Sequence, residues 1–154
     1  MRSSNLLFIA SWVILLVVST AIIVLSAQSL WIAYTGGPDR LTTEDTLTQI
    51  GEQGGDQAVK AFRGRRATAA TWALGYGFLA VAVIWIPYRR GQKWAWWAVL
   101  LSMGLSQFMS LGRAIMLGST VGTGAPAVLI AFVLLGLLAG APRMFGIRDA
   151  GLEK

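Results

Sequence analysis

The stretch from residue 67 to residue 117 decides the fold, and it reads ATAATWALGYGFLAVAVIWIPYRRGQKWAWWAVLLSMGLSQFMSLGRAIML. It contains two apolar runs joined by a tight basic turn, Tyr88 to Trp94, in which three cations and a glycine lie between aromatic residues. An α-helix needs about 20 apolar residues to cross a bilayer, and each run approaches that length. The turn is too short for anything but an antiparallel helical hairpin. The stretch therefore predicts two membrane helices with a lipid–water boundary at the turn.

The composition of the whole chain also predicts that most of it is surrounded by lipid. The 154 residues are 55% hydrophobic and 13% charged, whereas soluble domains are about one quarter charged. All seven carboxylates lie outside the long apolar runs: Asp39, Glu44, Asp45, Glu52, Asp56, Asp149 and Glu153. We therefore expect an integral membrane protein. Its net charge of +6 is best explained by contact with anionic lipid head groups, and no nucleic-acid partner is expected.

Two further apolar runs complete the predicted architecture. We expect one all-α membrane domain, a four-helix bundle with spans at 6–34, 67–88, 94–117 and 125–141 and a tail at 142–154. Residues 35–66 are the only long polar segment. Their apolar positions recur near helical spacing around Gly54 and Gly55, which predicts one or two amphipathic helices outside the membrane. A solvated connector with a weak apolar face is the alternative.

The ends of the spans carry the residues that prefer a membrane surface. We interpret six of them as interface anchors: Trp31, Trp85, Arg89, Arg90, Lys93 and Trp94. Seven cations are expected on the side of the two termini, and five or six on the side of the long loop. Because cytoplasmic ends carry the excess of Lys and Arg, this margin favours cytoplasmic N- and C-termini.

Residue types that carry chemistry are scarce. The chain has no cysteine and no histidine, which excludes disulfides, thiolate chemistry, haem ligation by those residues and the usual zinc or copper sites. No Asp, Glu, His or Lys lies within a predicted span, so a proton-coupled exporter would lack its titrating group. We therefore expect no catalytic residue, no metal site and no cofactor.

One polar stripe on the third predicted span has two interpretations. Ser102, Ser106, Ser110 and Arg113 share a helical face, with Gln107 alongside. They are candidates for a ligand pocket that opens toward the long loop and ends at a fixed cation, suited to an amphiphile with an anionic head. The alternative is serine-mediated helix packing, with the Arg113 side chain reaching the head groups or a carboxylate of the loop.

Glycines predict where helices approach one another closely. The second predicted span carries the small residues Thr68, Thr71, Gly75 and Gly77, and Gly136 and Gly140 form a GxxxG pair on the fourth. Such residues favour helix–helix contact, either inside the bundle or between subunits.

The overall plan resembles small four-span bacterial membrane proteins, including the DoxX-like group. The shared features are a long first loop, a second span that ends in Tyr88-Arg89-Arg90-Gly91-Gln92-Lys93-Trp94, and a glycine-punctuated fourth span. The resemblance implies a bacterial inner membrane, but no functional residue carries over from it. Together with the scarcity of reactive groups, the pattern predicts a non-enzymatic accessory or scaffolding subunit that contacts the bilayer and either other membrane subunits or its own copies. The alternatives are a carrier of an apolar ligand (lipid, quinone or carotenoid) and an oligomeric pore.

Overall fold

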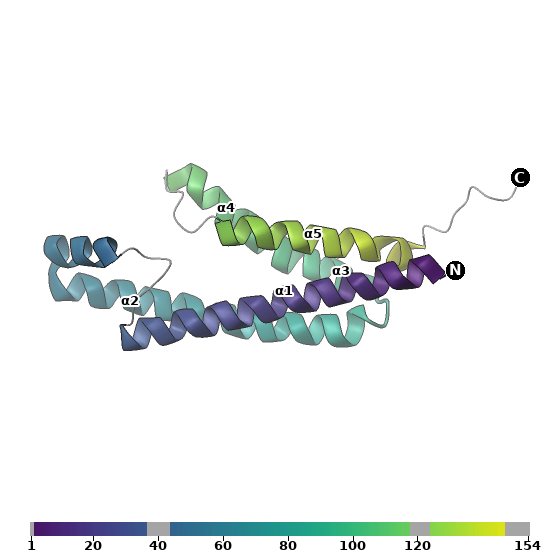
Figure 1. The fold of residues 1–154 in the computed structure, drawn as a ribbon, viewed down its shortest axis with the longest axis horizontal. Coiled ribbons are helices and arrows are strands. Elements are labelled where there is room, and N and C mark those ends of the chain that lie inside the picture. Colours follow the sequence, from purple (N-terminus) through teal and green to yellow (C-terminus); the bar gives the residue numbers. More distant parts are fainter. Residues whose placement is uncertain (1, 37–43, 118–123, 147–154) are drawn as a thin grey trace, which may run out of the picture. The chain divides into compact units, whose positions relative to one another are not determined.

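The computed structural model describes residues 2–36, 44–117 and 124–146, without the side chains of 2–4, 44–50, 113–115 and 117. Every element in these ranges is helical, and Figure 1 traces their order along the chain. Three helices among the described residues are long and apolar enough to cross a bilayer: Asn5–Thr35, Gly51–Tyr88 and Gly124–Phe145. Most of the residues in their apolar windows remain unburied, as lipid-facing surfaces do. The chain is therefore a helical protein with three candidate membrane spans.

The first helix, α1 (Arg2–Thr35), matches the first apolar run. Its buried side chains recur every three or four residues, at Phe8, Ser11, Leu15, Val18 and Ile22. This is the spacing of one helix face. The other faces are apolar as well, with Leu6, Val17 and Val24 exposed among others. A helix that is apolar all round but buried on one stripe is what a membrane protein requires.

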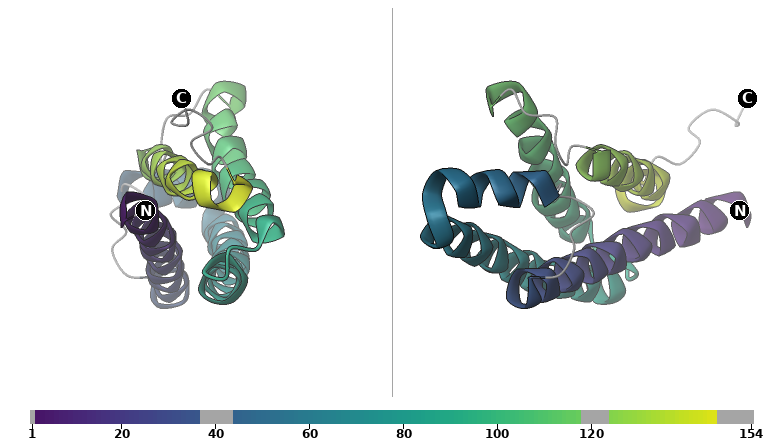
Figure 2. Two further views of the ribbon diagram at one scale, coloured as in Figure 1. Left: turned by 90° about the vertical axis from the view of Figure 1, so that its right-hand side faces the viewer. Right: turned by 60° about the vertical axis from the view of Figure 1, so that its left-hand side comes forward.

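The second helix, α2 (Glu44–Val83), is interrupted at Gly55, whose φ of 66° and ψ of −175° are not helical. Only glycine adopts this conformation readily. The chain folds back there, so that residues 44–54 and 56–83 form two helices joined by a sharp bend (Figures 1 and 2). The break falls at the glycine pair that the sequence singled out. The second helix runs through Arg66 into the apolar run without a boundary.

The basic turn is preceded by a π-helical segment, η1 (Ile84–Tyr88), which contains Pro87. Proline has no N–H to donate, and a π-helical turn accommodates the displaced backbone hydrogen bonds. The Arg89 N–H donates to the Ile84 carbonyl over 3.2 Å, and the Gln92 N–H donates to the Pro87 carbonyl over 3.1 Å. Gly91, with φ of 73°, reverses the chain. The helical hairpin predicted for this turn is present in the structure, and Figure 2 shows it from two further directions.

The predicted third span is helical but interrupted. It consists of α3 (Lys93–Val99), the π-helical η2 (Leu100–Gly104) and α4 (Leu105–Leu117) in direct succession. It is not among the three candidate spans in the described part of the chain, so the four-span bundle is not confirmed. The stretch carries three serines, Gln107 and two glycines, and the side chains of residues 113–115 and 117 lie outside the described ones.

The last helix, α5 (Gly124–Phe145), continues past Pro142, where the sequence predicted the end of the span. Pro142 lies within the last turn and has no N–H to donate to the carbonyl four residues earlier, and the helix ends three residues later. Arg143 lies in the same turn, and a cation there interacts favourably with the helix dipole.

The chain divides into two compact units, which are described separately. Unit 1 comprises Met1–Thr20 and Leu79–Lys154, and unit 2 comprises Ala21–Phe78. In unit 1, the first part of α1 runs antiparallel to α5, because Asn5 contacts Arg143 while Leu15 lies against Gly136. In unit 2, the second part of α1 runs antiparallel to α2, because Ile23 lies against Gly77 while Ser29 accepts a hydrogen bond from Arg66.

Candidate functional site

The most strongly structured part of unit 1 is a buried polar centre at Tyr88. The Tyr88 side chain, at the end of η1, is 0% exposed, and so is Ser11 on α1. The Ser11 Oγ lies 2.7 Å from the Tyr88 hydroxyl and donates to the Gly136 carbonyl of α5 over 2.7 Å. Since a serine hydroxyl has one hydrogen, the Tyr88 O–H must be the donor to Ser11. The hydrogen bonds from Tyr88 to Ser11 and from Ser11 to Gly136 thus connect η1, α1 and α5. Both hydroxyl hydrogens are donated in these two bonds.

The GxxxG pair of α5 makes this centre possible. A Cβ at Gly136 would lie 2.9 Å from Leu15 Cγ, and a Cβ at Gly140 would lie 2.6 Å from Ser11 Oγ and overlap the Tyr88 hydroxyl. No real side chain tolerates such distances without displacing its neighbours. Both glycines therefore lie in close contact with α1 inside unit 1.

Aromatic side chains surround the polar centre. Phe8 stacks on Tyr88 with ring centroids 6.0 Å apart and an interplanar angle of 2°. Trp96 of α3 donates its Nε1–H to the Leu137 carbonyl over 2.9 Å and packs edge-on against Phe145. A buried indole N–H needs a partner, and this one fastens α3 to α5.

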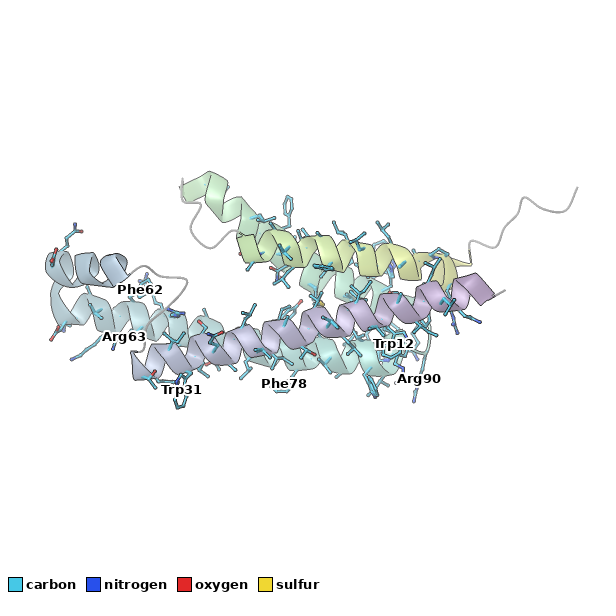
Figure 3. The ribbon with its side chains drawn as sticks, in the orientation of Figure 1. Trp12, Trp31, Phe62, Arg63, Phe78 and Arg90 are labelled. Carbon is cyan, nitrogen blue, oxygen red and sulfur yellow. The ribbon has the colours of Figure 1, made fainter. Side chains whose placement is uncertain are left out.

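Two arginines flank the aromatic cluster. The Arg89 guanidinium contacts a pair of edge-to-face indoles, 4.8 Å from the ring centroid of Trp12 and 4.4 Å from that of Trp85. Arg143 lies 4.3 Å from the Phe8 ring centroid and donates to the Asn5 amide oxygen over 3.1 Å. Each cation–π contact is favourable by about 0.5–1 kcal/mol at an exposed site. Figure 3 labels Trp12 and Arg90 at this end of unit 1.

An open surface cavity of about 340 Å³ adjoins the stacked arginine. Trp85, Ile86, Arg89 and Arg90 line it. Trp85 and Ile86 are both about half exposed, and the two arginines are exposed. The cavity thus combines an apolar wall with two permanent cations, the combination that an anionic amphiphile needs.

The serine stripe predicted as a ligand pocket has a different setting. Ser102 and Ser106 are exposed, and their hydroxyls donate to carbonyls of their own helix, those of Ala98 and Met103. Gln107 and Ser110 are half-buried, and the Arg113 side chain lies outside the described side chains. The cavity at the basic turn does not include these residues, and the pocket at the serines stays a prediction.

The six predicted interface anchors are all exposed: Trp31, Trp85, Arg89, Arg90, Lys93 and Trp94. Trp94 donates its Nε1–H to the Gln92 side chain over 2.7 Å, which holds the indole at the turn. Exposure suits residues that reach head groups, although the anchoring role stays a prediction.

In unit 2, the two glycines predicted for close helix contact differ in their surroundings. Gly77 is buried, and a Cβ there would lie 2.6 Å from Ile23 Cγ1. Gly75 is exposed, and a Cβ there would meet no atom within 4 Å. Within the described residues, Gly75 therefore has no packing partner, and Gly77 makes the contact between α2 and α1.

The part that α1 plays in the polar centre was not predicted from the sequence. Ser11 and Ser19 are both 0% exposed, and they are eight residues apart on the inner face of the helix. Ser19 donates to the Leu15 carbonyl over 2.8 Å. Serines recurring at this spacing in an otherwise apolar run were the available signal, because small polar residues are enriched where membrane helices pack together.

The chemistry open to this centre is limited by its residue types. Among the described residues, no group of three or more His, Cys, Asp or Glu is placed to hold a metal ion. Tyr88 and Ser11 face each other and a backbone carbonyl, with their hydroxyl hydrogens engaged. Such an arrangement suits a structural fastening. Comparison of the chain with protein-family models, curated proteins and solved structures finds no match in any of the three.

Proposed function

We propose that this chain is a non-enzymatic accessory or scaffolding subunit that binds another membrane protein through α2. The observation that carries the proposal is a stripe of small residues on α2, formed by Gly64, Thr68, Thr71 and Gly75. We call it the α2 stripe. Its spacing of four, three and four residues places its members on one helix face. All four are exposed.

The surroundings of the α2 stripe support a contact with a foreign helix. A Cβ at Gly64 or Gly75 would meet no atom within 4 Å. The hydroxyls of Thr68 and Thr71 donate to the carbonyls of Gly64 and Ala67. Both hydroxyls therefore have acceptors within α2, and the stripe presents only small side chains. Trp72 beside the stripe is 77% exposed. Small residues at this spacing allow two backbones to approach closely, and a flanking large side chain fills the space beside them.

The rest of the proposal concerns the membrane. We infer that the helical stretch 93–117 crosses the bilayer as a fourth span and that the setting is a bacterial inner membrane with both termini cytoplasmic. Support comes from the exposed apolar side chains Leu101, Leu105 and Phe108 on that stretch. The cations Arg89 and Arg143 flank a single aromatic cluster in unit 1. A basic end of this kind is typical of the cytoplasmic side.

Extraction of native membranes into polymer-bounded lipid discs tests the proposal. We expect the tagged wild-type chain to be recovered with a fixed membrane partner and to migrate above its own mass on a native gel. Gly75→Leu should abolish that recovery, because the leucine fills the approach of the partner helix. Ala69→Leu is the matched control, since Ala69 is also small and exposed but lies on a different face of α2.

Two outcomes contradict the subunit proposal. Recovery of the wild type as a lone chain would exclude a stable partner. Recovery of only a second, differently tagged copy of this chain would identify self-association in place of an accessory role. Loss of the partner in both Gly75→Leu and Ala69→Leu would remove the α2 stripe as the contact.

A further inference from the structure

We propose that the cavity at the basic turn, lined by Trp85, Ile86, Arg89 and Arg90, binds the phosphate head group of an anionic phospholipid. The ligand chemistry is a phosphate anion attached to an apolar tail. The first support is charge. Within the described part of the chain, no carboxylate pairs with either arginine, and neither guanidinium donates a hydrogen bond to another described group. Two permanent cations therefore line one cavity of about 340 Å³ with their N–H groups available.

The second support is the pre-organisation of Arg89. Its guanidinium contacts the indoles of both Trp12 and Trp85, at 4.8 and 4.4 Å from the ring centroids. The two indoles are perpendicular to each other, with an interplanar angle of 85°, and no other described group accepts a hydrogen bond from the N–H edge of the guanidinium. This edge matches two oxygens of a phosphate, which arginine binds in a bidentate manner. Since the rings already restrict the side chain, less conformational entropy is lost on binding.

The third support is the apolar wall. Trp85 and Ile86 lie one turn before the two arginines on the same segment, on the side of the apolar helix. They are 52% and 51% exposed, so each presents apolar surface beside the cations. An indole at the lipid–water boundary suits the glycerol region of a lipid. A phosphate held at Arg89 and Arg90 would thus place the first acyl carbons against Trp85 and Ile86.

The backbone holds this arrangement in place. The Arg89 N–H donates to Ile84, and the Gly91 N–H donates to Tyr88 over 2.9 Å. Tyr88 is itself fixed by Ser11. The two arginines therefore follow directly on a buried residue, which limits their movement relative to α1.

Lipid retention measured by native mass spectrometry tests the proposal. The full chain is released from discs that contain equal amounts of phosphatidylglycerol and phosphatidylcholine. We expect at least one phosphatidylglycerol to stay bound and its excess over phosphatidylcholine to fall about tenfold in Arg90→Gln, because a charge-assisted pair is lost. Arg89→Lys, which keeps the charge but loses the planar fork, should also reduce it.

Lys93→Gln is the matched control. It removes one positive charge from the same turn, and Lys93 is exposed but does not line the cavity. We expect a change of less than about twofold, the size of a surface-potential effect. An equal loss of phosphatidylglycerol in Lys93→Gln and Arg90→Gln would overturn the proposal. The lipid preference would then depend on the net charge of the turn and not on the cavity.

A competition experiment separates a lipid from a free anion. We expect inorganic phosphate at millimolar concentration to leave the bound phosphatidylglycerol in place, because it lacks the contact with Trp85 and Ile86. Displacement of the lipid by inorganic phosphate would overturn the lipid assignment and indicate a site for a soluble phosphate. Equal retention of phosphatidylglycerol and phosphatidylcholine by the wild type would overturn the site altogether.

Discussion

Two pairs of glycines in this protein each lie on one face of a helix and have opposite surroundings. Gly136 and Gly140 on α5 lie so close to Leu15, Ser11 and Tyr88 that neither position has room for a Cβ. Gly64 and Gly75 on α2 have open space in the same place. Small residues at helical spacing therefore indicate that a backbone can be approached closely. Whether this chain or another molecule makes the approach depends on what else lies along the face.

The difference between the two faces is chemical as well as steric. The α5 face meets hydroxyls, because Ser11 donates to the Gly136 carbonyl. The α2 stripe carries threonines whose hydroxyls already donate to their own helix. The α5 contact is therefore a polar fastening inside unit 1. The α2 stripe is suited to van der Waals contact with a partner.

The largest effect is expected where the space is smallest. Gly140→Leu should destabilise the chain by about 3 kcal/mol or prevent folding, because the new side chain overlaps Tyr88 and Ser11. The measurement is equilibrium unfolding in mixed micelles. A stable, normally folded Gly140→Leu protein would show that α5 does not pack on α1 as described.

A smaller effect is expected at the hydroxyls, with a definite order. Ser11→Ala leaves the buried Tyr88 hydroxyl without its acceptor and should cost about 2 kcal/mol. Tyr88→Phe removes the hydroxyl together with its hydrogen bond, so the tyrosine donor is not left unpaired. Ser11 stays bonded to Gly136, and the expected cost is about 1 kcal/mol. The same unfolding measurement compares the two variants. The reverse order would contradict the direction of donation from Tyr88 to Ser11.

The smallest effect is expected at the open glycine. Gly75→Leu should leave the free energy of unfolding of the isolated chain unchanged or raise it by up to about 1 kcal/mol, because nothing is displaced and leucine has the higher helix propensity. Ala69→Leu serves again as the control on another face. Strong destabilisation by Gly75→Leu alone would show that the α2 stripe packs within the chain, and the contrast with α5 would disappear.

Much of the fold is predictable from the sequence because it depends on local chemistry. The apolar runs predict the helices, and the two-glycine break predicts the bend at Gly55. The basic turn from Arg89 to Lys93 predicts the helical hairpin. Hydropathy alone did not settle the third predicted span, where serines and Gln107 lower the apolar content of an otherwise helical stretch.

The candidate site was less predictable. The sequence pointed to the serines of α4, whereas the described cavity lies at Trp85 and Arg89. Trp85 and Arg89 were predicted as interface anchors, and both line the cavity. They are four residues apart at one helix end, so their proximity is a local property. The cation–π contact between Arg89 and Trp12 is not local, because it joins residues 77 positions apart.

From the sequence alone follow the helical class, the apolar character of the spans and the absence of cysteine and histidine, because each is a property of residue types or of neighbours along one helix. Only the tertiary structure decided which glycines are in contact, that Ser11 fastens Tyr88 to Gly136, and that Gly77 rather than Gly75 meets α1. Such contacts depend on how one helix is rotated about its axis against another. That rotation is set by packing between distant segments, which the hydropathy of a helix that is apolar on every side does not encode.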